Sequence, residues 1–214
     1  MTPIRKQYLT AAQSALDLLR GPAVAAAWEA ASALEGFTVG GLAAHLASQI
    51  TSGAAALEAD FGGKDVIGVL DHYERARASW LEADVGNDYN TAIKDRGNAE
   101  AGAGPGEVAA AAEAALKTLH ERLPGLGDGA LGGVGRWAYA TSLDDFLVTR
   151  IMELVVHADD LAVSVGVATP EFDADAFDTA AWVLTRLAAR RHGQAALVRA
   201  LARAERAPDS ITAL

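Results

Sequence analysis

Residues 143–166 read LDDFLVTRIMELVVHADDLAVSVG, and this stretch decides the fold of the chain. Ser142 and Asp145 fit the capping-box pattern, with Asp in place of Glu, so a helix is expected to begin directly after Ser142. Apolar residues then recur at three- and four-residue spacing, and Gly166 offers a C-terminal stop. The stretch therefore predicts one long helix over residues 143–165.

The rest of the chain also favours helix, because Ala and Leu dominate and runs of β-branched residues are short. We expect helices over residues 4–20, 38–59, 107–123, 174–192 and 194–203, a helical turn over 24–31, and a helix from about Asp65 that has Val66, Leu70, Tyr73, Arg77 and Trp80 on one face and continues through Tyr89 and Ile93. A short strand or hairpin is expected between Pro124 and Ala140. The predicted fold class is all-α.

Length and composition bound the domain count and the partners. A chain of 214 residues, 51% of them apolar, can bury a sizeable core, and we expect a bundle over residues 1–168 with a C-terminal helical extension, residues 169–214, packed on the same domain. The 18 Lys and Arg against 28 Asp and Glu give a net charge of −10, which repels phosphate backbones and anionic lipid headgroups. Nucleic acid is therefore not an expected partner.

The chain has no cysteine, so any thiol chemistry must come from a small molecule. The N-terminal MTPIRKQYLT has no apolar signal-peptide core behind it, which predicts a cytoplasmic protein. Residues 36–57 contain no acidic or basic residue other than His45, and the stretch is long enough to raise the question of a membrane span. Polar residues such as Gln49 and Thr51 among the alanines favour a buried bundle helix instead.

Glu153 and His157 are four residues apart on the predicted helix, so their side chains share one face and are close enough to bind one metal ion. Asp160 extends this polar stripe by another turn. An ordinary surface pair has the same spacing, and the spacing alone does not separate the two interpretations.

His45 lies between Leu42 and Leu46 on a helix of small and aliphatic residues. A lone histidine on such a face is commonly a hydrogen-bonded core residue. Together with Glu153 and His157, however, it completes a set of two histidines and one carboxylate, the ligand count of an open catalytic zinc site. We interpret the remaining histidines as structural or surface residues: His72, His120 and His192.

Two motifs resemble those of the actinobacterial maleylpyruvate isomerase-type proteins of the DinB-like superfamily, which are metal-binding helical bundles that include mycothiol-dependent enzymes. TVGGLAAHLA (38–47) is similar to the family's TVxDLxxHLA, and RIMELVVHADDLAVSVG (150–166) is similar to its RxxELxxHxxDLxxALG. The closing ALARAERAPDSITAL (200–214) also looks like the family. The resemblance implies an all-α, DinB-like four-helix bundle, with additional C-terminal helices in this chain.

The resemblance also implies roles for single residues. His45, Glu153 and His157 are then the ligands of a divalent metal, usually zinc, and Asp160 lies near that metal. An arginine of the intervening helix, Arg75, would face an anionic substrate. Family isomerases carry an α/β domain after the bundle, whereas residues after Thr169 favour helices here.

The family has a charged residue after TV, and Gly40-Gly41 replaces it here, so we expect a looser start to this helix.

These observations predict a zinc-dependent enzyme that activates mycothiol for S-transfer to, or isomerisation of, a small electrophilic substrate. In it, Asp160 orients a ligand histidine or handles a proton, and Arg75 holds a carboxylate. A metal-dependent hydrolase using zinc-bound water needs the same ligands, and a non-catalytic small-molecule-binding bundle is the third alternative. The expected partners are a thiol and an electrophile, without nucleic acid or membrane, and a homodimer is compatible with the sequence. No Walker loop, GxSxG or HExxH motif supports other hydrolytic mechanisms.

Overall fold

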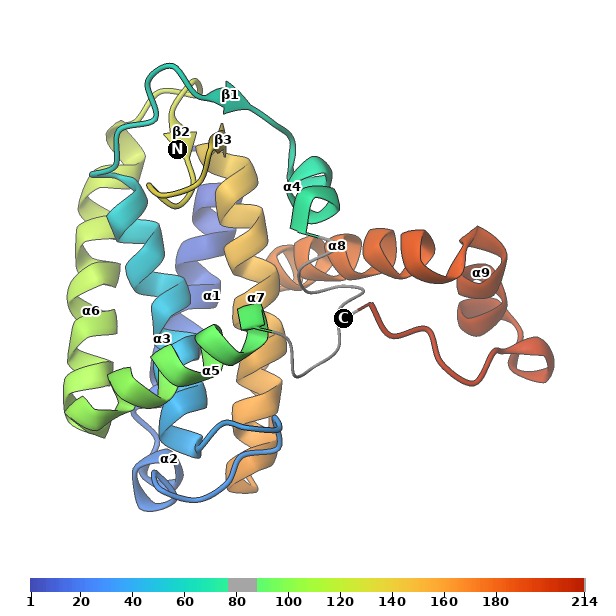
Figure 1. Ribbon diagram of the computed structural model, residues 1–214, viewed down its shortest axis with the longest axis horizontal. Helices are drawn as coiled ribbons and strands as arrows, with labels where there is room; N and C mark the ends of the chain where they lie inside the picture. Colours follow the sequence, from blue (N-terminus) through green and yellow to red (C-terminus); the bar gives the residue numbers. More distant parts are fainter. Residues whose placement is uncertain (77–87, 214) are drawn as a thin grey trace.

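Four long helices lie side by side in the computed structural model, which describes residues 1–76 and 88–213 (Figure 1). They are α1 (Pro3–Leu19), α3 (Val39–Ala56), α6 (Pro105–Arg122) and α7 (Leu143–Val165). Helix α3 packs against α6 and α7, and α1 contacts the same two helices. The prediction of an all-α, DinB-like four-helix bundle with additional C-terminal helices is confirmed.

Capping residues fix where the two site-bearing helices begin and end. The Thr38 hydroxyl accepts a hydrogen bond from Gly41 N at 2.9 Å at the start of α3, and the Ser142 hydroxyl accepts one from Asp145 N at 3.0 Å at the start of α7. Helix α7 ends at Gly166, whose φ of 69° lies in the left-handed region that favours glycine. The predicted limits of this helix, residues 143–165, are confirmed.

The start of α3 is tightly packed against the segment that precedes it. Gly40 is buried, and a Cβ atom added there would lie 2.6 Å from Cε2 of Trp28, closer than side chains approach one another. The looser start expected from Gly40-Gly41 is therefore wrong, because glycine here admits the indole ring. The helix ends at Ala56, three residues before the predicted end.

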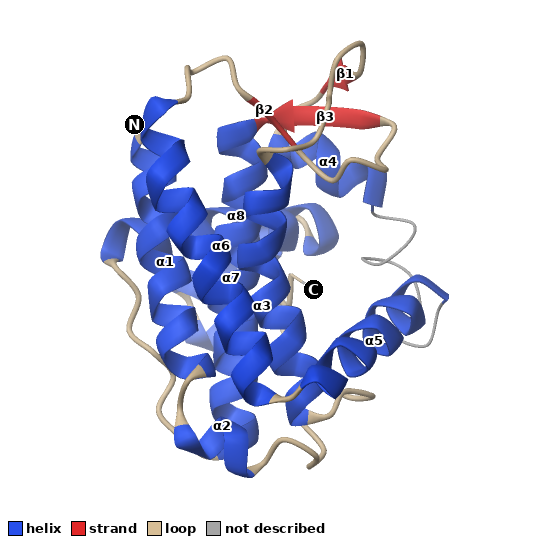
Figure 2. Ribbon diagram, turned by 90° about the vertical axis from the view of Figure 1, so that its left-hand side faces the viewer, coloured by secondary structure: helices blue, strands red, loops and turns tan. Residues whose placement is uncertain are grey.

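Short elements close the end of the bundle where α7 begins (Figure 2). A three-stranded sheet has the order β1 (Asp65–Val66), β3 (Tyr139–Ser142), β2 (Leu131–Gly132), with β1 parallel and β2 antiparallel to β3. The strand expected between Pro124 and Ala140 is thus confirmed as a pair, although β3 runs on to Ser142. Helix α4 (Val69–Ala76) follows β1 and contacts α7.

The helix expected from Asp65 begins later than predicted. Backbone pairing holds this segment in a strand, because Ile67 N donates to Ala140 O at 2.9 Å directly after β1. The first helical carbonyl is that of Gly68, which accepts from His72 N at 3.0 Å. Arg77 and Trp80 lie outside the described residues, and the helical pattern resumes in α5 (Asp88–Glu100). The turn expected at 24–31 is α2 (Pro22–Ala26).

The C-terminal helices α8 (Ala174–His192) and α9 (Gln194–Ala202) match the prediction closely. Helix α8 packs against α7 and α1, whereas α9 has no buried residue and lies away from the bundle (Figure 1). The division of the chain at residue 168 stays a prediction. Within the described parts of the chain, no helix is both long enough and apolar enough to cross a bilayer.

Candidate metal centre

Helix α7 carries three of the predicted site residues on the face that meets α3. Glu153, His157 and Asp160 follow one another at spacings of four and three residues, so each lies about one turn from the next. The buried aliphatic residues Leu154 and Leu161 occupy the neighbouring positions on the core side of the same helix. Close packing of α7 therefore fixes the direction of the polar stripe.

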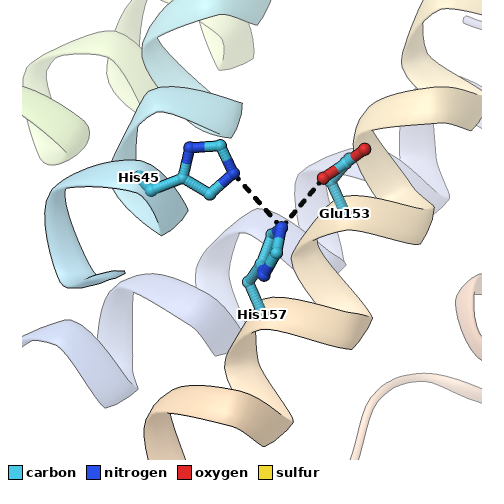
Figure 3. A group of neighbouring side chains, drawn as sticks. All are labelled: His45, Glu153 and His157. Carbon is cyan, nitrogen blue, oxygen red and sulfur yellow. Dashed lines mark hydrogen bonds and ion pairs between the residues drawn. The ribbon is translucent and has the colours of Figure 1, made fainter. Parts of the chain in front are cut away.

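His45 approaches this stripe from α3, where it stands between the fully buried Leu42 and Leu46 (Figure 3). Its Nε2 atom lies 3.2 Å from Nε2 of His157. The same His157 nitrogen lies 3.0 Å from Oε2 of Glu153. The structure thus brings together the three residues predicted as ligands, although 108 positions separate the first two in sequence.

The donor atoms of these three side chains suit a divalent metal. One ligand atom from each of His45, Glu153 and His157 lies within 4.8 Å of the others. Two ligands bound to one tetrahedral zinc at 2.0–2.1 Å are about 3.3 Å apart, close to the nitrogen–nitrogen and nitrogen–oxygen separations here. Two imidazoles and one carboxylate are also a donor set that zinc accepts in catalytic sites. The residues present therefore fit the ion.

Without a metal, the three side chains interact as charged and neutral groups. Burial would lower the pKa of His157, but hydrogen bonds to Asp160 and Glu153 outweigh it and raise the pKa to about 9. Burial would raise the pKa of Glu153, yet the hydrogen bond from His157 and the positive charges nearby lower it to about 2. Burial, with the charge of His157, lowers the pKa of His45 to about 3. A neutral imidazole therefore faces an ion pair.

Asp160 supports His157 from the side opposite Glu153. Its Oδ2 atom lies 3.0 Å from Nδ1 of His157 and accepts the proton of that nitrogen. A carboxylate in this position fixes the orientation of an imidazole and leaves Nε2 free to bind a metal. Whether Asp160 orients His157 or handles a proton stays a prediction.

Arg75, the arginine predicted to face a substrate carboxylate, lies on α4 and is exposed. Its guanidinium carbon is 5.0 Å from the centre of the Tyr139 ring, over which it stacks. The described residues show no contact between Arg75 and His45, Glu153 or His157. Its role stays a prediction.

Sequence reasoning missed two residues, Arg150 and Gln49, that lie next to the three candidate ligands. Arg150 precedes Glu153 by three residues, and Gln49 follows His45 by four, so both lie about one turn away. Nη1 of Arg150 donates to Oε1 of Gln49 at 2.5 Å. The spacing of Arg150 to Glu153 could have revealed the first, and a buried amide on an apolar helix the second.

The remaining histidines match the structural or surface interpretation. His72 is 8% exposed and packs between rings, with Nδ1 2.8 Å from the Tyr139 hydroxyl and its ring centre 4.8 Å from that of Trp137. His120 is exposed on α6, and Nε2 of His192 donates to Thr212 O at 2.9 Å. None of the three belongs to the candidate metal cluster.

A groove of about 580 Å³ opens beside Asp160, between α7 and the segment that leads into α8. Val156 and the aromatic rings of Phe172 and Phe177 form part of its wall. Asp160 borders this groove and also contacts His157, so it connects the groove to the candidate metal cluster.

A bundle whose α3 and α7 bring two histidines and a glutamate together is a helical bundle of the DinB-like class. Within that class the chain belongs to the mycothiol maleylpyruvate isomerase N-terminal domain family, whose profile matches residues 9–162. The match includes His45, Glu153, His157 and Asp160 and excludes α8 and α9. No curated protein and no solved structure shows significant similarity to the chain.

Proposed function

We propose that this protein is a zinc-dependent enzyme that activates mycothiol for S-transfer to, or isomerisation of, a small electrophilic substrate. The observation that carries the proposal is the cluster of His45, Glu153 and His157, whose donor atoms lie within 4.8 Å of one another. Membership of a family named for a mycothiol-dependent isomerase supports the choice of thiol. A divalent cation at this cluster would lower the pKa of a thiol or water that it binds.

The chain's own residues supply the remaining requirements. Three protein donors are one fewer than the four of a closed structural zinc site, which leaves room for an external ligand. The thiol has to be that external molecule, because the chain has no cysteine. Asp160 accepts the Nδ1 proton of His157 and thereby keeps Nε2 directed at the cluster. The groove beside Asp160 can receive the body of a thiol much larger than water.

The proposal is tested by the dependence of turnover on the thiol. Chlorodinitrobenzene and a maleyl compound are assayed with mycothiol, with glutathione and without thiol, using the wild type and His45→Ala. We expect turnover that saturates in mycothiol and disappears in His45→Ala, because no protein thiol can contribute a background. Thiol-independent cleavage of esters or amides would instead identify a hydrolase, and metal without turnover of any substrate class would identify a binding protein.

Asp160→Asn separates two roles of that carboxylate. If Asp160 transfers a proton, the variant keeps its metal and loses turnover by about ten- to ten-thousand-fold. If Asp160 only orients His157, metal affinity falls by about 10- to 100-fold. Metal analysis and turnover measured on the same preparation distinguish the two results. Asp178→Asn, at an exposed position of α8, is the matched control.

A further inference from the structure

Arg150 and Gln49 form a second polar layer between α3 and α7, one turn from the candidate metal cluster. Gln49 is 2% exposed, and its Nε2 atom donates to His45 O at 3.0 Å while its Oε1 atom accepts from Arg150 at 2.5 Å. Nε of Arg150 donates to the Thr149 hydroxyl at 3.1 Å. The bonds to Gln49 and Thr149 hold the guanidinium of Arg150 in one position beside the cluster.

Part of the guanidinium of Arg150 has no partner among the residues that the structure describes. In residues 1–76 and 88–213, the Nη2 group of Arg150 makes no hydrogen bond, and no carboxylate lies within 4.0 Å of its guanidinium. An arginine presents five N–H donors in a planar fork that matches the two oxygens of a carboxylate. An incompletely paired guanidinium between two helices is therefore suited to bind an anion.

The charge of Arg150 also reaches a residue of the neighbouring helix. It lowers the pKa of the His72 imidazole, after the larger effect of burial. His72 lies on α4, which packs against the helix α7 that carries Arg150. Arg150 thus supplies positive potential to the space in which α4 faces the cluster.

We propose that Arg150 binds the carboxylate of an anionic small substrate beside the metal cluster. The chemistry that follows rests on the proposed function, but the binding of the anion does not. The assignment differs from that of Arg75, whose exposed guanidinium stacks over Tyr139. If Arg150 only balanced the charge of Glu153, an added carboxylate would gain nothing from it, and this difference makes the proposal testable.

The experiment measures binding of maleate, a small dianion, by isothermal titration calorimetry without any thiol. Maleamide, its neutral analogue, is the ligand control, and Arg186→Met on the exposed face of α8 is the matched protein control. We expect Arg150→Met to weaken maleate binding by about 10- to 100-fold, the effect of losing a charge-assisted hydrogen bond. Arg150→Lys should recover part of the affinity, because it keeps the charge and loses the fork.

Each titration is repeated on metal-loaded and metal-free protein, with circular dichroism and metal content measured for every variant. An effect of Arg150→Met in both forms, without an effect of Arg186→Met, supports the proposal. Equal maleate affinity of the wild type and a folded Arg150→Met overturns it, as does maleate binding that needs the metal and ignores Arg150. The absence of thiol-dependent turnover would contradict the proposed function alone, since maleate binding is measured without thiol.

Discussion

Arg5 of α1 and Arg150 of α7 both lie between helices of the bundle, yet their guanidinium groups have different surroundings. Arg5 is 1% exposed, and its donors meet Asp144 Oδ1 at 2.9 Å, Leu126 O at 2.6 Å and Gly127 O at 2.9 Å. Arg150 has two partners, and its Nη2 group has none in the part of the chain that the structure describes. Each nitrogen of the Arg5 guanidinium donates a hydrogen bond, whereas Nη2 of Arg150 donates none to the described residues.

The same contrast extends to the residues around each arginine. The partners of Arg5 join α1 to the start of α7 and to the loop that precedes β2, so they connect segments of the fold. Arg150 instead bonds to Gln49, which also donates to the backbone carbonyl of the candidate ligand His45. From this difference we expect the cluster around Arg5 to serve stability and the cluster around Arg150 to serve binding. Four substitutions or conditions test this separation.

The largest expected effect is the loss of metal in His157→Ala. The wild type should carry about one divalent ion per chain, and the variant should carry almost none, because His157 supplies one of the three candidate donors. His120→Ala, at an exposed position of α6, is the control and should keep its metal. Elemental analysis of both purified variants measures the effect. Equal metal in the two variants would remove His157 from the ligand set.

Arg5→Met should give the second largest effect, on stability and not on metal content. The substitution leaves backbone carbonyls such as Leu126 O without a donor and Asp144 without its partner. We expect the free energy of unfolding to fall by about 3 kcal/mol. Urea denaturation measures the change, and Arg186→Met should stay within about 0.5 kcal/mol of the wild type. A drop below about 1 kcal/mol in Arg5→Met would contradict the structural role of this cluster.

Metal affinity should rise with pH by about tenfold per unit between pH 6.5 and 9. The pKa of His157 is raised to about 9 in the metal-free protein, so its proton stabilises the fold below pH 6.5 and this contribution is lost as the pH rises through 9. A metal has to displace that proton. Calorimetric titration in buffers of different ionisation enthalpy should count about one proton released per ion at pH 7.5. Affinity that is independent of pH would show that His157 is not a ligand.

The smallest expected effect is that of Arg150→Met on stability. The side chain makes two hydrogen bonds, and a methionine can pack against Phe146, over which the guanidinium now lies at 5.2 Å. We expect the free energy of unfolding to change by less than about 1 kcal/mol. Urea denaturation beside Arg5→Met makes the comparison direct. A loss as large as that of Arg5→Met would assign Arg150 to the fold and not to binding.

Local sequence patterns predicted the fold well where capping residues directly before and after a helix mark its limits. Ser142 and Gly166 define α7 in the sequence and in the structure, because capping depends on neighbouring residues alone. Asp65 and Val66 were assigned to a helix because their strand exists only through pairing with Tyr139 and Ala140. Partners so distant in sequence cannot be read from local periodicity.

The candidate site shows the same difference between residues that local spacing reveals and residues whose position depends on another helix. Glu153 and His157 share a helix, so their spacing in the sequence is informative, and His45 stands out because a histidine is unusual on an apolar face. The position of Arg150 is not predictable in this way, because an arginine in a helix usually points to solvent and this one bonds to Gln49 of α3. The role of Arg75 came from resemblance and stays a prediction.

The unequal division of the site between two helices has a consequence for how α3 and α7 are aligned along their axes. Helix α3 is rich in small residues, including Ala43, Ala44 and Ala47, and such side chains form shallow ridges that resist sliding weakly. A slip of one turn, about 5.4 Å, would carry Gln49 to the level now held by His45. An ion shared by His45 and the stripe on α7 would oppose that slip. The metal centre would then also set the register of the two helices.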